Sequence, residues 1–159
     1  MDDLARRRTL QGRRVAVTGH RGFIGAHLVR DLRSAGALVS AIEGDVTTTS
    51  TWHTKFEVLF HLAAVMGERF SEKPGFGFSV NVGGTIQALE ACRTNGADMV
   101  FPSTCGVYDP RLSGAVSEEA DARPATSYGQ SKLAAEVICQ SYADHFNVRC
   151  RVLRLFNVY

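Results

Sequence analysis

The sequence predicts an α/β fold in which a parallel β-sheet is doubly wound by helices. Short apolar runs rich in β-branched residues alternate with longer segments of helical periodicity, and several runs are apolar throughout, as in strands buried on both faces. A glycine-rich turn follows the first run directly, which is typical of a strand that leads into a helix. Parallel strands joined through helices imply right-handed crossovers.

The elements follow one another in a regular order. Strands are expected at residues 14–18, 38–42, 58–61, 99–103 and 149–153. Helices are expected at residues 25–35, 82–94 and 127–145, and Asn95-Gly96 would end the second helix. Residues 43–55 lack apolar periodicity, which predicts a loop with one short helical turn. Residues 109–126 carry prolines and scattered acids, which predicts a surface loop at the carboxyl edge of the sheet, where ligands bind in such folds.

Length and composition fit one ordinary globular domain, since 159 residues with 45% apolar content can bury a single core. We expect residues 1–12, which include Arg6, Arg7 and Arg8, to be a polar leader and residues 13–159 to be the domain. The net charge of +2 gives no electrostatic reason to expect a nucleic-acid partner. Because no apolar run suits a membrane span or a secretion signal, a cytoplasmic protein is expected. The cysteines show no metal-ligand spacing, so no metal site is predicted.

Three glycines, Gly19, Gly22 and Gly25, lie three residues apart between the first expected strand and helix. Glycine lets the backbone approach a pyrophosphate, whose charge is attracted by the amide groups and dipole of the helix N-terminus. The spacing differs from the standard dinucleotide fingerprint, and a tight structural turn fits it equally well. A phosphate site at this turn therefore needs a second signal.

Glu43, at the end of the second expected strand, supplies that signal. An acid at this position can accept hydrogen bonds from the ribose diol of NAD, although a solvated acid at a strand end is the alternative. Arg21, inside the glycine turn, could instead pair with the 2′-phosphate of NADP, or face water. We predict NAD as the cofactor and keep NADP as the alternative.

Candidate catalytic residues come from the third expected helix and the strand before it. Tyr128 and Lys132 lie four residues apart, so their side chains emerge on one helix face. An ammonium beside a phenol favours the phenolate, which makes Tyr128 a candidate general base and acid. Ser103 and Thr104 end the preceding strand and offer hydroxyls that could share a substrate oxygen with Tyr128, although such hydroxyls often bond local backbone. A hydroxyl, a phenol and a lysine are the parts needed to pass hydride from a carbinol to a nicotinamide.

Six motifs follow one another along the chain: TGHRGFIG at residues 18–25, FHLAAV at 60–65, NVGGT at 81–85, STCGVY at 103–108, YGQSK at 128–132 and RLFNVY at 154–159. Together they resemble the extended short-chain dehydrogenase/reductases, and more narrowly the NAD-dependent epimerases/dehydratases that act on nucleotide sugars. The resemblance implies a Rossmann-type sheet and an epimerase with tightly bound NAD. Such an enzyme inverts a sugar centre through transient hydride transfer and a keto-sugar, with a UDP-sugar as the expected substrate.

The resemblance also implies roles for individual residues. Gly19, Gly22 and Gly25 would cradle the pyrophosphate, with backbone amides from Phe23 and Ile24. The remaining cofactor contacts would come from Arg21, Glu43, Asp45, Val46, Leu62, Ala63, Ala64, Asn81, Tyr128, Lys132 and Phe156. Asn81 would sit behind the nicotinamide ribose, whose hydroxyls Lys132 would hold. Asn157 would reach the phosphates of the substrate, and catalysis would fall to Thr104, Tyr128 and Lys132.

Two departures from the family pattern lie inside the chain. Asp45-Val46 follows Glu43 almost directly, so one strand and its helix should be missing between the second and fourth strands, while Asp45 and Val46 still line the adenine pocket. Cys105 and Gly106 stand where dehydratases carry an Asp-Glu pair, so the general acid for water elimination is missing and epimerisation is favoured.

Two further departures bear on the cofactor and on activity. The GHRG turn with Arg21 is similar to that of GDP-fucose synthase-like epimerase-reductases, which use NADP. The chain stops at Tyr159, where the family continues, so the C-terminal substrate domain is expected to be absent and activity of the chain alone is in doubt.

Several functions therefore stay open. The first is the NAD-dependent epimerase, the second an NADP-dependent reductase or epimerase-reductase, and the third a non-catalytic nucleotide-binding module or inactive fragment. The resemblance also implies a homodimer through a helix bundle formed by residues 82–94 and 127–145, where Ala134 and Ala135 would permit close approach. The residues do not specify the sugar, the nucleotide or the reacting carbon.

Overall fold

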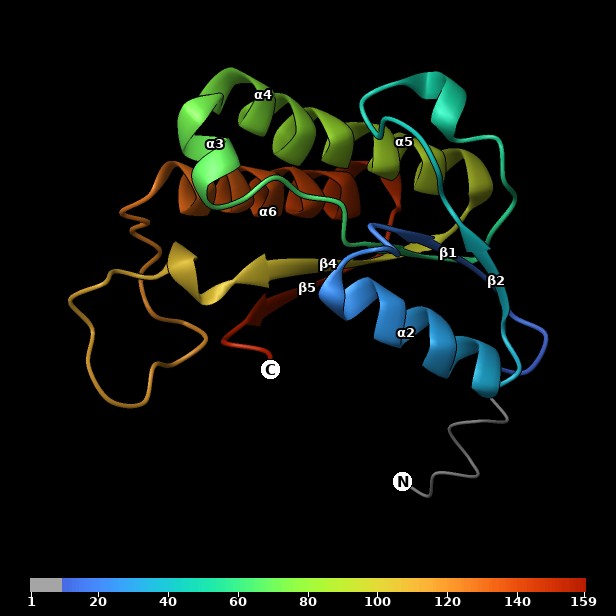
Figure 1. Cartoon of the computed structure of the whole chain (residues 1–159), viewed down its shortest axis with the longest axis horizontal. Coiled ribbons are helices and arrows are strands. Elements are labelled where there is room, and N and C mark those ends of the chain that lie inside the picture. The colour runs from blue at the N-terminus through green and yellow to red at the C-terminus, as the bar shows by residue number, and fades with distance from the viewer. Residues whose placement is uncertain (1–9) are drawn as a thin grey trace.

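A five-stranded parallel sheet forms the centre of the structure, a computed structural model that describes residues 10–159 (Figure 1). Residues 1–9 of the expected leader, with Arg6, Arg7 and Arg8, lie outside the described residues. The strands are β1 (Arg14–Thr18), β2 (Leu38–Ala41), β3 (Val58–His61), β4 (Asp98–Thr104) and β5 (Cys150–Leu155). Their order across the sheet is β2-β1-β3-β4-β5, and each neighbouring pair is parallel.

Helices cover both faces of the sheet. One face carries α2 (Phe23–Ser34), and the other carries α3 (Glu68–Glu72), α4 (Pro74–Phe78), α5 (Gly84–Asn95) and α6 (Ser127–Phe146) (Figure 1). Short helical turns lie at η1 (Thr49–Thr51), η2 (Ser79–Gly83) and η3 (Cys105–Val107). The predicted α/β fold with a Rossmann-type doubly wound sheet is confirmed. Within residues 10–159, no helix has the length and apolar character needed to cross a membrane.

The alternation of side chains along β1 shows why the strands are apolar throughout. Val15 and Val17 pack towards α2, whereas Ala16 joins the larger core beneath α5 and α6. Because successive strand residues point to opposite faces, a strand covered on both sides must be apolar at each position. The larger core includes Leu59 and Phe101, and burial of each such side chain stabilises the fold by about 1.5–3 kcal/mol.

The chain crosses from β2 to β3 without forming a further strand. β1 pairs with β2 on one side and with β3 on the other, so that Val15 lies opposite both Val39 and Val58. The crossing has η1 as its helical turn, and it is held by the Asp45 carboxylate, which accepts hydrogen bonds from the amide and hydroxyl of Thr47 at 2.9 and 2.8 Å. The sheet is shortened here as expected.

The sequence does not predict α3 and α4, because helices of five residues are too short to show apolar periodicity. The helix expected over 82–94 is preceded by η2, a π-helical turn. The strands expected at residues 14–18 and 58–61 have the observed bounds, and the other expected elements differ from the observed bounds by at most two residues at either end. Residues 109–126 form the expected loop, which extends from the end of β4 (Figure 1) and is pinned by a bridge between Tyr108 and Ala122.

Candidate functional site

The turn between β1 and α2 brings the backbone close to the loop that follows β3. Gly19 has a φ of +65°, in the left-handed region, and a Cβ there would lie 2.7 Å from the amide nitrogen of Ala63. A Cβ on Gly25 would overlap the carbonyl oxygen of Gly19. α2 begins at Phe23, and the first turn of a helix leaves amide groups without intrahelical partners. The turn therefore fits an anion that approaches the backbone closely.

A groove runs across the carboxyl ends of the strands beside this turn. Its first part is a cleft of about 470 Å³ lined by Gly19, Gly22, Phe23, Ile24, Gly25, Leu62, Ala64, Thr104, Tyr128, Lys132, Phe156 and Asn157, among others. Its second part is a hollow of about 440 Å³ lined by Gly19, Gly22, Asp45, Val46, Leu62, Ala63 and Ala64, among others. The glycine turn is common to both parts. Most of the predicted site residues thus converge on one groove at the edge of the sheet where such folds bind ligands.

Tyr128 lies in the first turn of α6 and lines the cleft. The hydroxyl of Thr126 caps this helix by accepting a hydrogen bond from the Gly129 amide at 3.0 Å. The Tyr128 ring packs edge-to-face against Phe70, with the ring centroids 6.3 Å apart. Burial raises the pKa of the Tyr128 phenol above its usual value, and the nearby Cys105 thiol adds to the rise. The expected lowering by Lys132 is therefore not found.

Lys132 lies one helical turn beyond Tyr128 and is buried, with its ammonium 3.9 Å from the centroid of the Phe101 ring. Burial lowers the pKa of Lys132 to about 8, and the charges of Cys139 and Glu136 oppose this shift. An aromatic face attracts the cation but does not replace an oxygen acceptor. The ammonium thus suits the hydroxyl oxygens of a ligand in the cleft.

The two hydroxyls at the end of β4 have different surroundings. Thr104 lines the cleft, and its oxygen accepts a hydrogen bond from the Gly106 amide at 3.1 Å. A hydroxyl that accepts one hydrogen bond still has its own proton to donate, so Thr104 can also bind a ligand oxygen. Ser103 also borders the cleft, but its side chain is buried and its hydroxyl donates to the carboxylate of Glu136. Of the two candidates, Thr104 is the one available to a substrate.

The two residues predicted to select the cofactor bind each other. A carboxylate oxygen of Glu43 lies 2.9 Å from Nη2 of Arg21 and 3.1 Å from Nε2 of His20. Glu43 and Arg21 are mostly exposed, and an exposed pair of this kind contributes little to stability. Either side chain can therefore turn from its partner to a ribose diol or to a 2′-phosphate.

Asn81 lies behind the groove rather than on its wall. Its side-chain oxygen accepts a hydrogen bond from the Val65 amide at 2.7 Å, while its nitrogen donates to the Val65 carbonyl and the Ser131 hydroxyl, both at 2.9 Å. These bonds connect the loop after β3 to α6. Asn81 thereby supports the wall that Leu62, Ala63 and Ala64 form.

A buried polar pair beneath the glycine turn was not predicted as part of the site. The Thr18 hydroxyl accepts a hydrogen bond from the Ala63 amide at 3.1 Å and bonds Nδ1 of His61 at 3.0 Å. Burial, together with the charge of Lys132, lowers the pKa of His61 to about 3, so its ring is neutral at pH 7. Within the described part of the chain, Nε2 of His61 has no hydrogen-bond partner. A threonine before a glycine turn and a histidine at the end of a buried strand were the available signals.

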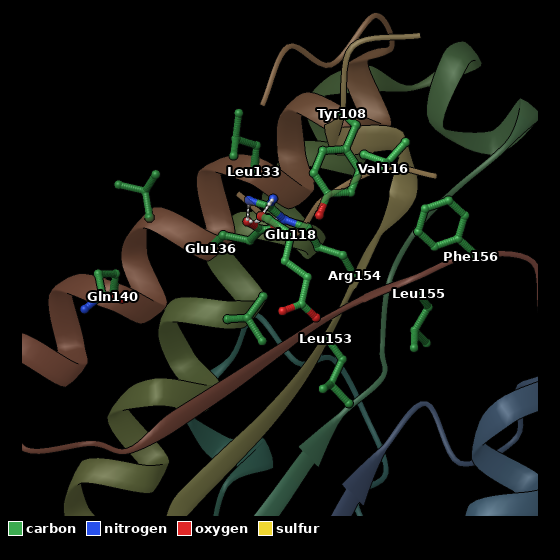
Figure 2. A pocket seen from close by; sticks show the side chains of 12 residues that line it. Tyr108, Val116, Glu118, Leu133, Glu136, Gln140, Leu153, Arg154, Leu155 and Phe156 are labelled. Atoms are coloured by element: carbon green, nitrogen blue, oxygen red, sulfur yellow. Dashed lines mark hydrogen bonds and ion pairs between the residues drawn. The ribbon is translucent and has the colours of Figure 1, made fainter. Parts of the chain in front are cut away.

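A hollow of about 830 Å³, larger than either part of the groove, lies elsewhere, along β5 and the neighbouring face of α6 (Figure 2). Of the predicted site residues, it shares Phe156 with the groove. Its walls include Tyr108, Glu136 and Arg154, which bind one another through a cation–π contact and an ion pair. Most of the predicted site residues therefore line the groove and not this hollow.

A glycine turn that leads from the first parallel strand into a helix N-terminus, beside a groove at the carboxyl edge of the sheet, defines a dinucleotide-binding domain. The family model described as the NAD dependent epimerase/dehydratase family matches residues 15–159. The chain belongs to this family, so the resemblance inferred from the six motifs is confirmed.

Individual relatives agree with this assignment. GDP-mannose 3,5-epimerase 1 from Oryza sativa subsp. japonica is 32% identical over 183 aligned residues, which cover 92% of this chain and 47% of that protein. The structure of MoeE5 in complex with UDP-glucose and NAD has a TM-score of 0.80 and 34% identity, and the match covers 91% of this chain and 55% of that one. The structure of RMD from Pseudomonas aeruginosa complexed with NADPH has a TM-score of 0.80 and 26% identity, with 91% and 54% covered. The chain spans about half the length of these relatives.

Proposed function

We propose that this chain is the cofactor-binding and catalytic part of a nucleotide-sugar epimerase with tightly bound NAD. The observation that carries the proposal is the convergence of Thr104, Tyr128 and Lys132 on the groove beside the glycine turn. The family match supports NAD, and the similarity to a protein that binds UDP-glucose and NAD supports a UDP-sugar as the substrate.

The residues of the groove fit NAD. The close approach of Gly19 to Ala63 leaves no room for side chains where a pyrophosphate would meet the amides of Phe23 and Ile24. The adenine side would be lined by Asp45, Val46, Leu62, Ala63 and Ala64. At the other side Lys132 would hold the nicotinamide ribose and Phe156 would pack near the nicotinamide, with Asn81 supporting the wall from behind.

In the proposed reaction Tyr128 removes the proton of a sugar hydroxyl while Thr104 donates a hydrogen bond that orients the same oxygen. When bound, NAD supplies a hydride acceptor that also returns the hydride. Because the reacting carbon of a keto-sugar is planar, this chemistry would allow the centre to be inverted, and Tyr128 would give the proton back to the sugar oxygen. Asn157 would bind the phosphates of the nucleotide sugar. The raised pKa of Tyr128 means that phenolate formation needs added positive charge near the ring.

Water elimination is not supported at this site. The two positions after Thr104 carry the thiol of Cys105 and the bare backbone of Gly106, neither of which is a suitable acid for a sugar hydroxyl. Cys105 lines the cleft close to Tyr128, where a dehydratase would need a carboxyl group. Inversion through a keto-sugar needs no such acid.

An NADP-dependent epimerase-reductase is the second candidate, because Arg21 lies beside the groove and could bind a 2′-phosphate. The similarity to a structure complexed with NADPH is compatible with it. In this case Arg21 would leave Glu43 for the phosphate, and the cofactor would be consumed rather than regenerated.

Calorimetric titration with NAD and NADP, for the chain and its Glu43→Ala variant, tests the cofactor assignment. We expect NAD to bind preferentially and the substitution to weaken NAD binding about 10- to 100-fold, because hydrogen bonds to a charged group contribute about 1.5–3 kcal/mol. Asp31→Ala, which removes an exposed carboxylate from α2, is the matched control and should leave NAD affinity unchanged. Preference for NADP would favour the second candidate, and binding of neither would contradict both.

Interconversion of UDP-sugars tests the reaction itself. Tyr128→Phe should lower the rate about 10²–10⁴-fold, the usual contribution of a general acid–base group. NAD affinity should change far less, because the substitution removes one hydroxyl. NAD binding without any turnover of UDP-sugars would instead support a nucleotide-binding module whose tyrosine and lysine are idle.

A further inference from the structure

An ion pair joins α6 to β5 in the wall of the hollow shown in Figure 2. Nη2 of Arg154 lies 2.8 Å from one carboxylate oxygen of Glu136, and Nε lies 3.2 and 3.1 Å from the two oxygens. Figure 2 shows the two side chains facing one another, with Tyr108 beside them. The pair is the most buried of the ion pairs among residues 10–159, with side chains 24% and 10% exposed. A forked contact of this kind fixes orientation as well as distance.

The same carboxylate also binds the end of β4. Ser103 and Arg154 lie opposite each other in the pairing of β4 with β5, so their side chains share one face of the sheet. Glu136 lies over both and accepts hydrogen bonds from both. The Arg154 guanidinium also lies 4.8 Å from the centroid of the Tyr108 ring, just beyond β4. One carboxylate thus connects two strands and a helix.

Each member of this cluster is next to a residue of the cleft. Ser103 itself borders the cleft and precedes Thr104 in β4, Glu136 lies one turn from Lys132 in α6, and Arg154 precedes Leu155, another residue of the cleft, in β5. A shift of the carboxylate would therefore move three walls of the cleft relative to one another. Catalytic geometry is sensitive to displacements of about 1 Å.

A purely structural role does not explain why the contact is ionic. Two charges lose hydration when they are buried, and well-packed apolar residues in their place often leave a fold equally stable or more stable. The pair between Asp98 and Arg149 joins the amino ends of the same two strands while largely exposed, at 37% and 83%. The connection of β4 to β5 therefore does not require a buried pair.

We propose that Ser103, Glu136 and Arg154 form a positioning cluster, which holds Thr104 and Lys132 in the relative placement that the cofactor and substrate require. The proposal rests on the proposed function of the groove. The members of the cluster are positioning residues, since they act through Thr104 and Lys132 and not on the reacting atoms.

The double variant Glu136→Leu/Arg154→Met tests this inference. Because it removes both charges, no charge is left buried alone, and we expect a melting temperature close to that of the unaltered chain. NAD affinity measured by calorimetry should fall about tenfold, as expected when Lys132 no longer meets the ribose correctly. The matched control is Asp98→Leu/Arg149→Met, which makes the same substitutions at the other end of β4 and β5 and should leave NAD affinity unchanged.

Lysine NMR gives a readout that does not depend on NAD. The chain has three lysines, and Lys55 and Lys73 are exposed, so they serve as internal references for the side-chain signal of Lys132. In the double variant the Lys132 signal should shift while the other two stay in place. Failure of the unaltered chain to bind NAD would count against the proposed function, whereas the Lys132 signal would still test the cluster.

An unchanged Lys132 signal and unchanged NAD affinity in a folded double variant would overturn the proposal. If that variant does not fold, the Arg154→Lys variant tests the proposal, because lysine keeps the positive charge but cannot make the forked contact with the Glu136 carboxylate. A shifted Lys132 signal with weaker NAD binding would then support positioning by the forked contact. Values equal to those of the unaltered chain would refute it.

Discussion

At the scale of single residues, aromatic side chains pack against the two main candidate catalytic groups, Lys132 and Tyr128. Phe101 holds the ammonium of Lys132, and Phe70 packs against the ring of Tyr128. Both side chains are largely buried. Burial favours the neutral form of each, so it raises the pKa of Tyr128 and lowers the pKa of Lys132. The phenol of Tyr128 is therefore neutral at pH 7, and the proton removal that we propose for it depends on charge that the ligands bring.

His61 makes a residue-scale prediction about stability. Its pKa is about 3 in the folded chain against 6.5 normally, so the unfolded chain binds a proton that the folded chain excludes. The contribution of His61 to the free energy of unfolding is therefore fully present above pH 6.5. It is lost as the pH falls from 6.5 towards 3, at about 1.4 kcal/mol per pH unit. His61→Asn does not titrate and can still bond Thr18. Urea unfolding between about pH 6 and pH 4 should show a shallower slope for the variant.

The comparison between the two proteins isolates this histidine, because all other titrating groups are common to both. Equal slopes would mean that His61 is not held neutral in the folded chain. The absolute stability of the variant does not matter for this test, since only the dependence on pH is compared.

At the scale of elements, contacts close in sequence were predictable and distant contacts were not. The glycine turn and the placement of Tyr128 and Lys132 along one cleft follow from spacing within one turn or helix. The bonds of Glu43 with Arg21 and of Glu136 with Arg154 and Ser103 join residues 22, 18 and 33 positions apart, so they depend on the register of the strands. The helices α3 and α4 also escape prediction, because what holds them is the burial of Phe70 against Tyr128 and Phe78.

The first turn of α2 makes an element-scale prediction. Gly25→Ala would drive a methyl group into the carbonyl oxygen of Gly19, and we expect the free energy of unfolding to fall by about 1–3 kcal/mol. NAD affinity should fall with it because the pyrophosphate turn is displaced. Gly83→Ala is the control, since its Cβ would meet no atom within 4 Å and alanine is favoured in helical backbone by about 0.5–1 kcal/mol. Urea unfolding should therefore show a lower free energy of unfolding for Gly25→Ala and a higher one for Gly83→Ala. A Gly25→Ala variant as stable as the unaltered chain would contradict the close approach of Gly25 to Gly19.

At the scale of the whole molecule, the groove opens at an edge where large apolar side chains are exposed. Phe23, Met66, Phe156 and Val158 are each more than half exposed around the cleft. Apolar surface gathered at the mouth of a site is typical of a place that binds a ligand or another surface. The sequence suggested Ala134 and Ala135 for a contact between two copies of the chain. Ala135 instead faces the core from α6 and is buried there, whereas Ala134 is partly accessible.

The order of the strands predicts a pattern of amide hydrogen exchange. β1 and β3 have neighbours on both sides, so their amides should exchange slowly at each position. Among residues 10–159, β5 has β4 as its neighbour on one side alone, and successive strand amides point to opposite sides. Exchange followed by NMR should therefore alternate between slow and fast along β5. Uniform protection of β5 would contradict a free edge and indicate that another chain pairs with it.

The environment of Lys132 has a consequence for chemical labelling. With a pKa of about 8, Lys132 carries a free amine in roughly a tenth of the molecules at pH 7. This fraction is far larger than for a lysine with the ordinary pKa of 10.5. The free amine is the nucleophilic form, and it lies inside a groove suited to a nucleotide. A nucleotide that carries an acylating group should therefore label Lys132 in preference to other lysines, because Lys132 has more free amine and lies where the nucleotide would bind.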